Sequence, residues 1–462
     1  MFRSEETIAA VATGTVSGAI SIIRISGPDA IAIADKVIML RRGTIADAPG
    51  YSLRYGTIVD LKNKVEIIDD VMVSIFRAPH SYTGEDSIEI ACHASSYIVS
   101  RIMEILVAAG ARPAGPGEFT QRAFASGKMD LAQAEAVSDI IAASSRASLR
   151  VAMNQMRGGV SAKLKEMRAK MLEITSLLEL ELDFSEEDVE FADRTRLSAL
   201  VDSSLAHVTA LADTFKTGNA IKNGIPVAIV GAPNVGKSTL LNALIGDDRA
   251  IVSDIAGTTR DTIEEPFTID GILFRFIDTA GIHDTDDTIE KIGVERALKK
   301  LEAADIVIAM ADISSPVLDS VIDSLNFDSQ KLIIVLNKAD KFSGSIPAVD
   351  LDLPEDRDIP VLTVSAKTGA GLDALKALLV ESQKDTSVDS DTVLITNARH
   401  HSALLATAES LIRVKNGLRN GIPSDLVAQD LRDALYHLGT ITGEISSDEI
   451  LGNIFSHFCI GK

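Results

Sequence analysis

Apolar residues along the first 125 or so positions come in short runs separated by glycine and proline. Short runs of this kind predict strands, and stretches in which apolar residues recur every three or four positions predict helices. The strand candidates are residues 19–25, 71–76 and 87–91, and the helix candidates are residues 30–40 and 96–109. Strands and helices mixed in this way predict an α+β domain.

The pattern changes at about residue 131, where Ala, Leu, Met, Glu and Lys become dominant and proline is absent until after residue 217. These residues are strong helix formers, and the apolar positions recur at helical spacing, so we expect long helices. The same pattern returns over residues 396–458.

Between the two helical stretches, strand and helix patterns alternate, which predicts a parallel α/β sheet. Its strand candidates are residues 227–230, 273–277, 305–309, 332–336 and 361–364. One helical domain interrupted by an inserted α/β domain explains this order most simply, since domain termini usually lie close together. The predicted domains are 1–126 (α+β), 127–222 (helical, first part), 223–383 (α/β) and 384–462 (helical, second part).

Charge and cysteine content narrow the class of protein. Lys and Arg number 45 against 66 Asp and Glu, a formal net charge of -21, which argues against a protein that grips nucleic acid by itself. Nucleic acid handled through a basic partner stays possible. Two cysteines far apart indicate no disulfide framework. Neither a signal peptide nor a membrane-spanning run is visible, so we expect a cytoplasmic protein without a membrane partner.

The segment 231–238 reads Gly-Ala-Pro-Asn-Val-Gly-Lys-Ser and directly follows the apolar strand candidate 227–230. This is the P-loop pattern, in which glycines let backbone N–H groups face phosphates and a helix N-terminus adds positive potential. Lys237 would reach the β- and γ-phosphates, and the Ser238 hydroxyl would bind Mg²⁺. We therefore predict a nucleoside-triphosphate site.

The identity of the base is indicated by Asn337-Lys338-Ala339-Asp340, which follows the strand candidate 332–336. A carboxylate at this strand end can accept hydrogen bonds from the ring N–H and amino group of guanine, and adenine lacks that pair of donors. Ser365-Ala366-Lys367 matches the second loop with which GTPases contact the base. The motifs together predict GTP.

Two segments match the loops of GTPases that respond to the γ-phosphate. Asp278-Thr279-Ala280-Gly281 ends a strand candidate, so Asp278 would hold Mg²⁺ through water and the Gly281 N–H would meet the phosphate. The second segment is residues 257–261, in which Thr259 is the candidate for a second Mg²⁺ ligand. The residues expected at GTP are Asn234, Val235, Gly236, Lys237, Ser238, Thr239, Ser253, Asp254, Ile255, Ala256, Gly257, Thr258, Thr259, Asp278, Thr279, Ala280, Gly281, Asn337, Lys338, Asp340, Ser365, Ala366 and Lys367.

Catalysis must differ from that of signalling GTPases, which often place a glutamine after the motif at 278–281 to orient water. Ile282 stands there and has no polar group. Either hydrolysis is slow and needs an additional factor, or another residue orients the water. Glu290 is the nearest carboxylate in a predicted switch helix, and an exposed helix glutamate without a catalytic role is the alternative.

The whole chain resembles the MnmE/TrmE family of tRNA-modification GTPases. The resemblance rests on the GTPase motifs and on two segments outside them, residues 117–139 and the terminal Phe-Cys-Ile-Gly-Lys at 458–462. It implies an N-terminal domain that binds a tetrahydrofolate and forms a homodimer, and a helical domain interrupted by the GTPase domain. It also implies a K⁺-activated reaction in which Glu290 orients water and Lys237 supports catalysis.

The resemblance further implies individual ligands. K⁺ would be held by Asn234, Ser253, Ile255 and Thr258, and the folate by Arg24, Glu89, Lys128 and Lys462. Without the resemblance, Arg24 and Lys128 read as surface charges and Glu89 as the polar face of a strand. Cys459 reads either as a small buried hydrophobe or as a participant in folate or tRNA chemistry, and Cys92 and His93 read as core and surface residues.

The function implied is modification of position 5 of the tRNA wobble uridine with a carboxymethylaminomethyl or aminomethyl group. The one-carbon unit would come from a 5,10-methylene or 5-formyl folate, and a flavoprotein partner, MnmG (GidA), would supply FAD and contact tRNA. Two alternatives remain: a regulatory GTPase of ribosome assembly, and a folate-dependent transferase whose GTPase is incidental. The first would need a basic RNA-binding module, and none is apparent in this acidic chain.

Overall fold

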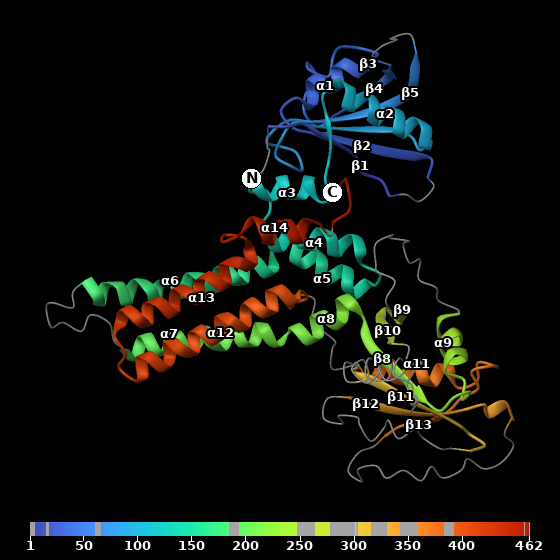
Figure 1. Cartoon of the computed structure of the whole chain (residues 1–462), viewed down its shortest axis with the longest axis vertical. Helices are drawn as coiled ribbons and strands as arrows, with labels where there is room; N and C mark the ends of the chain where they lie inside the picture. Colours follow the sequence, from blue (N-terminus) through green and yellow to red (C-terminus); the bar gives the residue numbers. More distant parts are fainter. Residues whose placement is uncertain are drawn as a thin grey trace, which may run out of the picture. The chain divides into compact units, whose positions relative to one another are not determined.

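The computed structural model describes residues 5–14, 18–60, 66–183, 194–246, 264–277, 301, 304–315, 330–341, 359–382, 392–456 and 458–461. Contacts divide the chain into two compact units, each made of segments distant in sequence. The first comprises Met1–Ser138, Gln155–Leu200 and Arg413–Lys462, and the second comprises Asp139–Asn154 and Val201–Ile412. Figure 1 shows the elements of each unit.

The first unit contains a seven-stranded sheet with the order β3-β4-β5-β6-β2-β1-β7. All neighbouring strands are antiparallel except β1 and β7, which are parallel. The strands are β1 (Ile8–Val11), β2 (Ile20–Ser26), β3 (Ile38–Leu40), β4 (Ser52–Val59), β5 (Ile67–Phe76), β6 (Ser87–His93) and β7 (Arg112–Pro113). With helices in the same unit, this arrangement agrees with the predicted α+β pattern.

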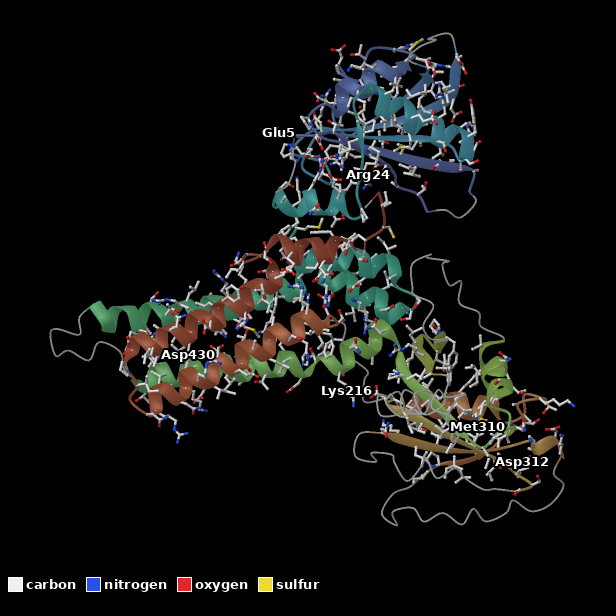
Figure 2. All side chains as sticks on the ribbon, in the orientation of Figure 1. Glu5, Arg24, Lys216, Met310, Asp312 and Asp430 are labelled. Atoms are coloured by element: carbon white, nitrogen blue, oxygen red, sulfur yellow. The ribbon has the colours of Figure 1, made fainter. Side chains whose placement is uncertain are left out.

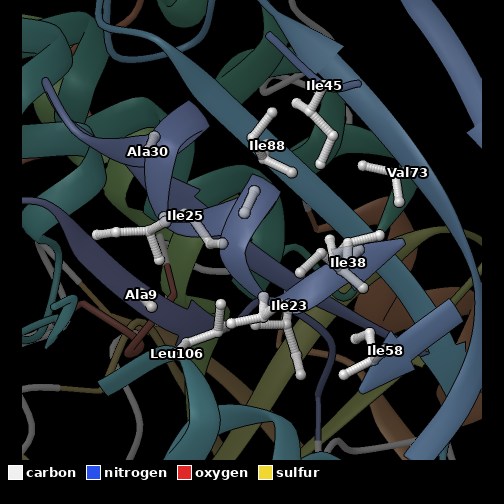
Figure 3. Packing of buried hydrophobic residues seen from close by; sticks show 14 of the residues in the cluster. Ala9, Ile23, Ile25, Ala30, Ile38, Ile45, Ile58, Val73, Ile88 and Leu106 are labelled. Carbon is white, nitrogen blue, oxygen red and sulfur yellow. The ribbon is translucent and has the colours of Figure 1, made fainter. Parts of the chain in front are cut away.

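Helices α1 (Ala30–Val37) and α2 (Ser96–Ala109) pack on one face of this sheet. Strand alternation sends Ile23, Ile25, Val73, Ile88 and Ile90 to that face, where they form one core with residues of both helices (Figure 3). The opposite face carries side chains that no helix of this core covers, and several of them are apolar and exposed: Met39, Leu53, Tyr55 and Met72.

The helix predicted over residues 30–40 is wrong at its end. The helix α1 ends at Val37, and residues 38–40 form β3 instead, with Ile38 opposite Ile58 and Leu40 opposite Gly56. The apolar run continues past the helix, but pairing with β4 satisfies its backbone groups at the edge of the sheet. Tertiary pairing therefore overrides the helical pattern at these three positions.

The carboxyl end of the chain joins the same unit. Helix α3 (Glu118–Ala125) precedes α4 (Leu131–Ala142), and the side chains of Leu131 and Ala134 pack with Phe455 of α14 (Asp448–Ser456). Ile460 forms a β-bridge with Pro116, and the Gly461 Cα lies so close to the Val11 carbonyl that a side chain there would collide. The last described residues thus contact β1.

Six further helices belong to the two units. They are α5 (Arg146–Met156), α6 (Gly159–Asp183), α7 (Arg194–Asp213), α8 (Phe215–Asn223), α12 (Ala398–Arg419) and α13 (Ser424–Thr442). Helices α6 and α13 pack side by side, and Arg168 forms an ion pair of 2.8 Å with Glu444 just beyond α13. None of the described helices combines the length and the apolar character needed to cross a membrane.

The second unit contains a six-stranded sheet with the order β13-β12-β11-β8-β10-β9. Its strands are β8 (Ile225–Gly231), β9 (Glu264–Ile269), β10 (Ile272–Ile277), β11 (Ile306–Asp312), β12 (Lys331–Asn337) and β13 (Val361–Thr363). All pairs are parallel except β9 with β10, which Asp270 and Gly271 join in a tight hairpin, both at positive φ. The predicted parallel α/β sheet is thereby confirmed.

We predict that native protein has one fast-reacting thiol. Cys459 is exposed, whereas Cys92 is 3% exposed, and burial, followed by the charge of Asp69, raises its pKa to about 11. Because the thiolate is the reactive species, a thiol reagent at pH 8 should label one cysteine quickly and both after denaturation. Cys459→Ser should remove the fast phase; a fast phase that persists would contradict the burial of Cys92.

Candidate functional site

The P-loop connects the central strand β8 to helix α9 (Lys237–Ile245). Gly236 precedes the helix at φ 103, and a Cβ there would come within 2.5 Å of the Asn337 amide nitrogen, so the position requires glycine. The Lys237 ammonium folds over the loop and donates to the carbonyls of Gly231 and Ala232. Ser238 and Thr239 lie in the first helical turn, where backbone N–H groups have no partner within the helix.

Asn337 connects the P-loop to the loop after β13. Its side chain is 3% exposed. The amide nitrogen donates to the Val235 carbonyl at 2.8 Å, and the amide oxygen accepts from the Ala366 N–H at 3.0 Å. Three segments that are distant in the sequence are therefore fixed against one another by one buried side chain.

Asp340 and Ser365 lie together, as the sequence predicts for two loops that contact one base. The Ser365 hydroxyl donates to an Asp340 oxygen at 2.6 Å. This hydrogen bond lowers the pKa of the exposed Asp340 carboxyl, so the group is ionised at neutral pH and can accept hydrogen bonds. Lys367 is exposed on the same loop.

One residue at this site has no counterpart among the sequence predictions. Asp312 ends β11 and forms an ion pair of 2.7 Å with Lys338. The only sequence signal was a carboxylate at the end of a buried strand, and nothing in the sequence pairs it with a lysine 26 positions later.

Several predicted residues lie outside the described residues. They are Ser253, Asp254, Ile255, Ala256, Gly257, Thr258, Thr259, Asp278, Thr279, Ala280, Gly281, Glu290 and Lys462. Of these, Asp278 directly follows β10, which pairs in parallel with β8. The roles of all of them stay predictions.

In the first unit, Arg24 and Glu89 form a cross-strand pair between β2 and β6. Two guanidinium nitrogens donate to one Glu89 oxygen at 3.0 and 2.8 Å. The Arg24 guanidinium also lies 5.3 Å from the ring centre of Tyr82 and 5.5 Å from that of Phe119. These two aromatic neighbours are absent from the sequence predictions, because no local pattern marks them.

The other two predicted folate ligands are placed differently. Lys128 is exposed, and its side chain approaches Gly84. Lys462 is outside the described residues, but Gly461 before it contacts Val11, one position after the Ala10 that pairs with Arg24. The structure therefore brings Arg24 and Glu89 together directly, and brings the chain before Lys462 to the adjacent strand.

The cysteine and histidine predictions have mixed outcomes. Cys92 is buried and His93 is exposed, as predicted. The Nδ1 atom of His93 lies 2.7 Å from a carboxylate oxygen of the buried Asp69. Cys459 is exposed, so its interpretation as a buried hydrophobe is wrong, although Phe458 before it is buried. Among the described residues, no group of His, Cys, Asp and Glu is arranged to hold a metal ion.

A glycine-rich loop joins a central parallel strand to a helix. The buried Asn337 side chain ties this loop to the loop at residues 365–367, where Ser365 pairs with Asp340. These features define a P-loop GTPase. Comparison with known proteins then gives the family. The model of the "MnmE helical domain" matches residues 131–459, and that of the "GTP-binding protein TrmE N-terminus" matches residues 7–128. The chain belongs to the MnmE family of tRNA modification GTPases.

Full-length relatives agree with this assignment. The tRNA modification GTPase MnmE of Bacteroides thetaiotaomicron is 47% identical over 99% of this chain and 100% of its own length, and that of Flavobacterium johnsoniae is 46% identical over 99% and 100%. A crystal structure of a single-residue variant of Aquifex aeolicus Era, bound to GDP.AlF4-, is 30% identical over 40% of this chain and 66% of that chain, with a TM-score of 0.29.

We predict that Asn337→Ala destabilises the second unit and weakens nucleotide binding. The change leaves the Val235 carbonyl and the Ala366 N–H without their side-chain partner, and an unpaired buried group costs roughly 1–3 kcal/mol. Urea unfolding followed by circular dichroism would measure the loss. Asn242→Ala, in α9 and outside these contacts, is the matched control; equal effects of the two changes would contradict the role of Asn337.

Proposed function

We propose that this chain binds and hydrolyses GTP at the P-loop and that the reaction serves modification of the tRNA wobble uridine. The observation that carries the proposal is the buried Asn337 side chain, which joins the phosphate-binding loop to the loop at residues 365–367. A phosphate site and a base site held at a fixed separation suit a nucleotide. Family membership supports the link to tRNA.

Guanine is the proposed base. The ionised Asp340 carboxylate accepts hydrogen bonds from the guanine ring N–H and amino group, and the Ser365 hydroxyl orients that carboxylate. Adenine would present an acceptor instead of the ring donor, so it would leave the carboxylate without its two partners. Lys338, Ala366 and Lys367 complete the base-contacting set.

The phosphates are bound by the N–H groups of residues 234–239 and by Lys237. Ser238 suits Mg²⁺, because its hydroxyl stands in the first turn of α9, and Thr259 would be the second ligand. Asn234, at φ 62 and exposed, suits K⁺ together with Ser253, Ile255 and Thr258. These cations neutralise phosphate charge when bound, and Glu290 would orient the attacking water.

The domain arrangement follows from the same proposal. The GTPase domain, residues 223–383, is inserted in a helical domain of residues 127–222 and 384–462. One family model spans residues 131–459, although the strands from β8 to β13 within that range form the α/β sheet, which supports an insertion. Residues 1–126 form the folate-binding domain, and the exposed apolar side chains on the open face of its sheet support its role in forming a homodimer.

The folate site is proposed at Arg24, Glu89, Lys128 and Lys462. A folate combines a pterin, which donates N–H groups, with a glutamate tail, which is anionic. Glu89 suits the pterin edge and Lys128 suits a carboxylate. Arg24 and Glu89 share the face on which Tyr82 and Phe119 provide aromatic surface, so a flat ring system has both polar and apolar partners there.

The remaining parts of the proposal concern partners. The net charge of -21 suits a protein whose basic partner binds the tRNA. That partner is the flavoprotein MnmG, which brings FAD, while this chain supplies the one-carbon unit as a 5,10-methylene or 5-formyl folate. We place the complex in the cytoplasm.

We predict that Lys237→Ala abolishes GTP hydrolysis and that cells carrying only this variant lose the modified wobble uridine. The lysine supplies the charge that holds the β- and γ-phosphates. Mass spectrometry of tRNA nucleosides measures the modification, and Lys216→Ala, at an exposed lysine outside the P-loop, is the matched control. Unchanged modification without hydrolysis would show that the two activities are not coupled.

A second prediction concerns the homodimer. Leu53 is 56% exposed on the open face of the sheet, so Leu53→Glu should place a charge in the proposed interface and shift the protein from dimer to monomer. Light scattering measures the mass. Leu426→Glu, at a leucine that is 58% exposed on α13, should leave the mass unchanged. A dimer that survives Leu53→Glu would contradict this interface.

A further inference from the structure

Asp312 occupies a specific place beside the proposed guanine site. It is the last residue of β11, and in the parallel register of β11 and β12 it lies opposite Asn337. Figure 2 labels it at this end of the sheet. The Ile313 N–H donates to the Asn337 carbonyl at 3.0 Å, so the chain leaving β11 stays attached to the start of the Asn-Lys-Ala-Asp segment.

Both carboxylate oxygens of Asp312 are engaged. One accepts from the Lys338 ammonium at 2.7 Å, and the other accepts from the backbone N–H of Ser314 at 3.0 Å and from its hydroxyl at 2.6 Å. These interactions, that with Lys338 first, lower the pKa of Asp312 to about 2. The group is therefore ionised at neutral pH.

Lys338 is held at both ends. Its backbone lies in the left-handed region, with φ 68, which residues other than glycine seldom adopt. On either side of it, the Asn337 carbonyl accepts from Ile313 and the Ala339 N–H donates to the Val364 carbonyl at 3.1 Å. Because the ammonium is fixed by Asp312, the four-carbon stem between backbone and head has lost most of its freedom before nucleotide binds.

We infer that Asp312 is a positioning residue for the guanine nucleotide and acts through Lys338. The ion pair holds the lysine stem in one conformation, and in the proposed complex the apolar surface of that stem packs against the base. A side chain ordered in advance does not have to be ordered by the ligand, so affinity is gained mainly through slower dissociation. This inference rests on the proposed assignment of the base to the loops at residues 337–340 and 365–367.

A purely structural role is the alternative, because Asp312 also bonds Ser314 in the turn after β11. Asp312→Asn separates the two roles. The amide keeps an oxygen that can accept from Ser314, but it carries no charge for Lys338. Lys338→Met is the partner variant, because methionine keeps an apolar stem and removes the ammonium.

The experiment measures the dissociation constant and dissociation rate of a fluorescent GDP, and the melting temperature without nucleotide, for the full chain. Asp312→Asn should weaken GDP binding about fivefold, as expected for a partly exposed ion pair, with most of the change in the dissociation rate. The melting temperature should stay close to that of the parent protein. In the Lys338→Met background, Asp312→Asn should have no further effect.

Asp305→Asn is the matched control. Asp305 precedes the same strand at its opposite end and lies 3.6 Å from Lys216, so the change removes the same charge away from the base site. GDP binding should be unaffected by it.

Three results would overturn the inference: unchanged GDP binding in Asp312→Asn, an undiminished effect in the Lys338→Met background, or a loss of affinity matched by a large fall in melting temperature. Failure of the proposed function gives a different result. Asp340→Asn would then leave the preference for guanine over xanthine nucleotides unchanged, whatever the Asp312 variants do.

Discussion

The buried side-chain amide of Asn337 is the interaction on which the nucleotide site depends. Its nitrogen donates to the Val235 carbonyl in the P-loop, and its oxygen accepts from the Ala366 N–H after β13. Neither isolated loop has a conformation that regular secondary structure would fix. Because the amide is buried and each bond has a backbone partner, displacing either loop would leave a buried polar group unpaired. This arrangement also requires glycine at position 236, since any side chain there would collide with the Asn337 amide.

A comparable principle applies in the first unit, where charged groups are ordered by pairing with groups of opposite charge. Arg24 and Glu89 are adjacent only because β2 and β6 are antiparallel in one particular register. Arg122, 7% exposed, is likewise held by Glu85 and Glu118, and Glu118 in turn binds Arg112. Charges that are costly to bury are tolerated because each has a partner. Arg24 on β2 and Arg112 on β7 thus lie on the two strands that flank β1, which the terminal segment contacts.

The two units differ in how their chain segments are brought together. The second unit is built around a sheet whose described strands pair in parallel except β9 with β10. The first unit joins the beginning of the chain to its end: Gly461 contacts Val11, and Phe455 packs with Leu131. The N-terminal sheet and the last described residues therefore belong to one packing unit.

The sequence by itself determined the elements and motifs whose causes are local. Apolar runs predict β8, β11 and β12 within a few residues, the Asp270-Gly271 hairpin follows from turn chemistry, and the P-loop and Asn-Lys-Ala-Asp segments each follow a strand as expected. Local patterns also misled, because residues 38–40 continue a helical run but pair with β4. Only the tertiary structure decided the pairings of Asp312 with Lys338, Arg24 with Glu89, and Asn337 with two loops. The physical reason is that a contact between residues tens of positions apart depends on strand order and register, which the pattern along one segment does not contain.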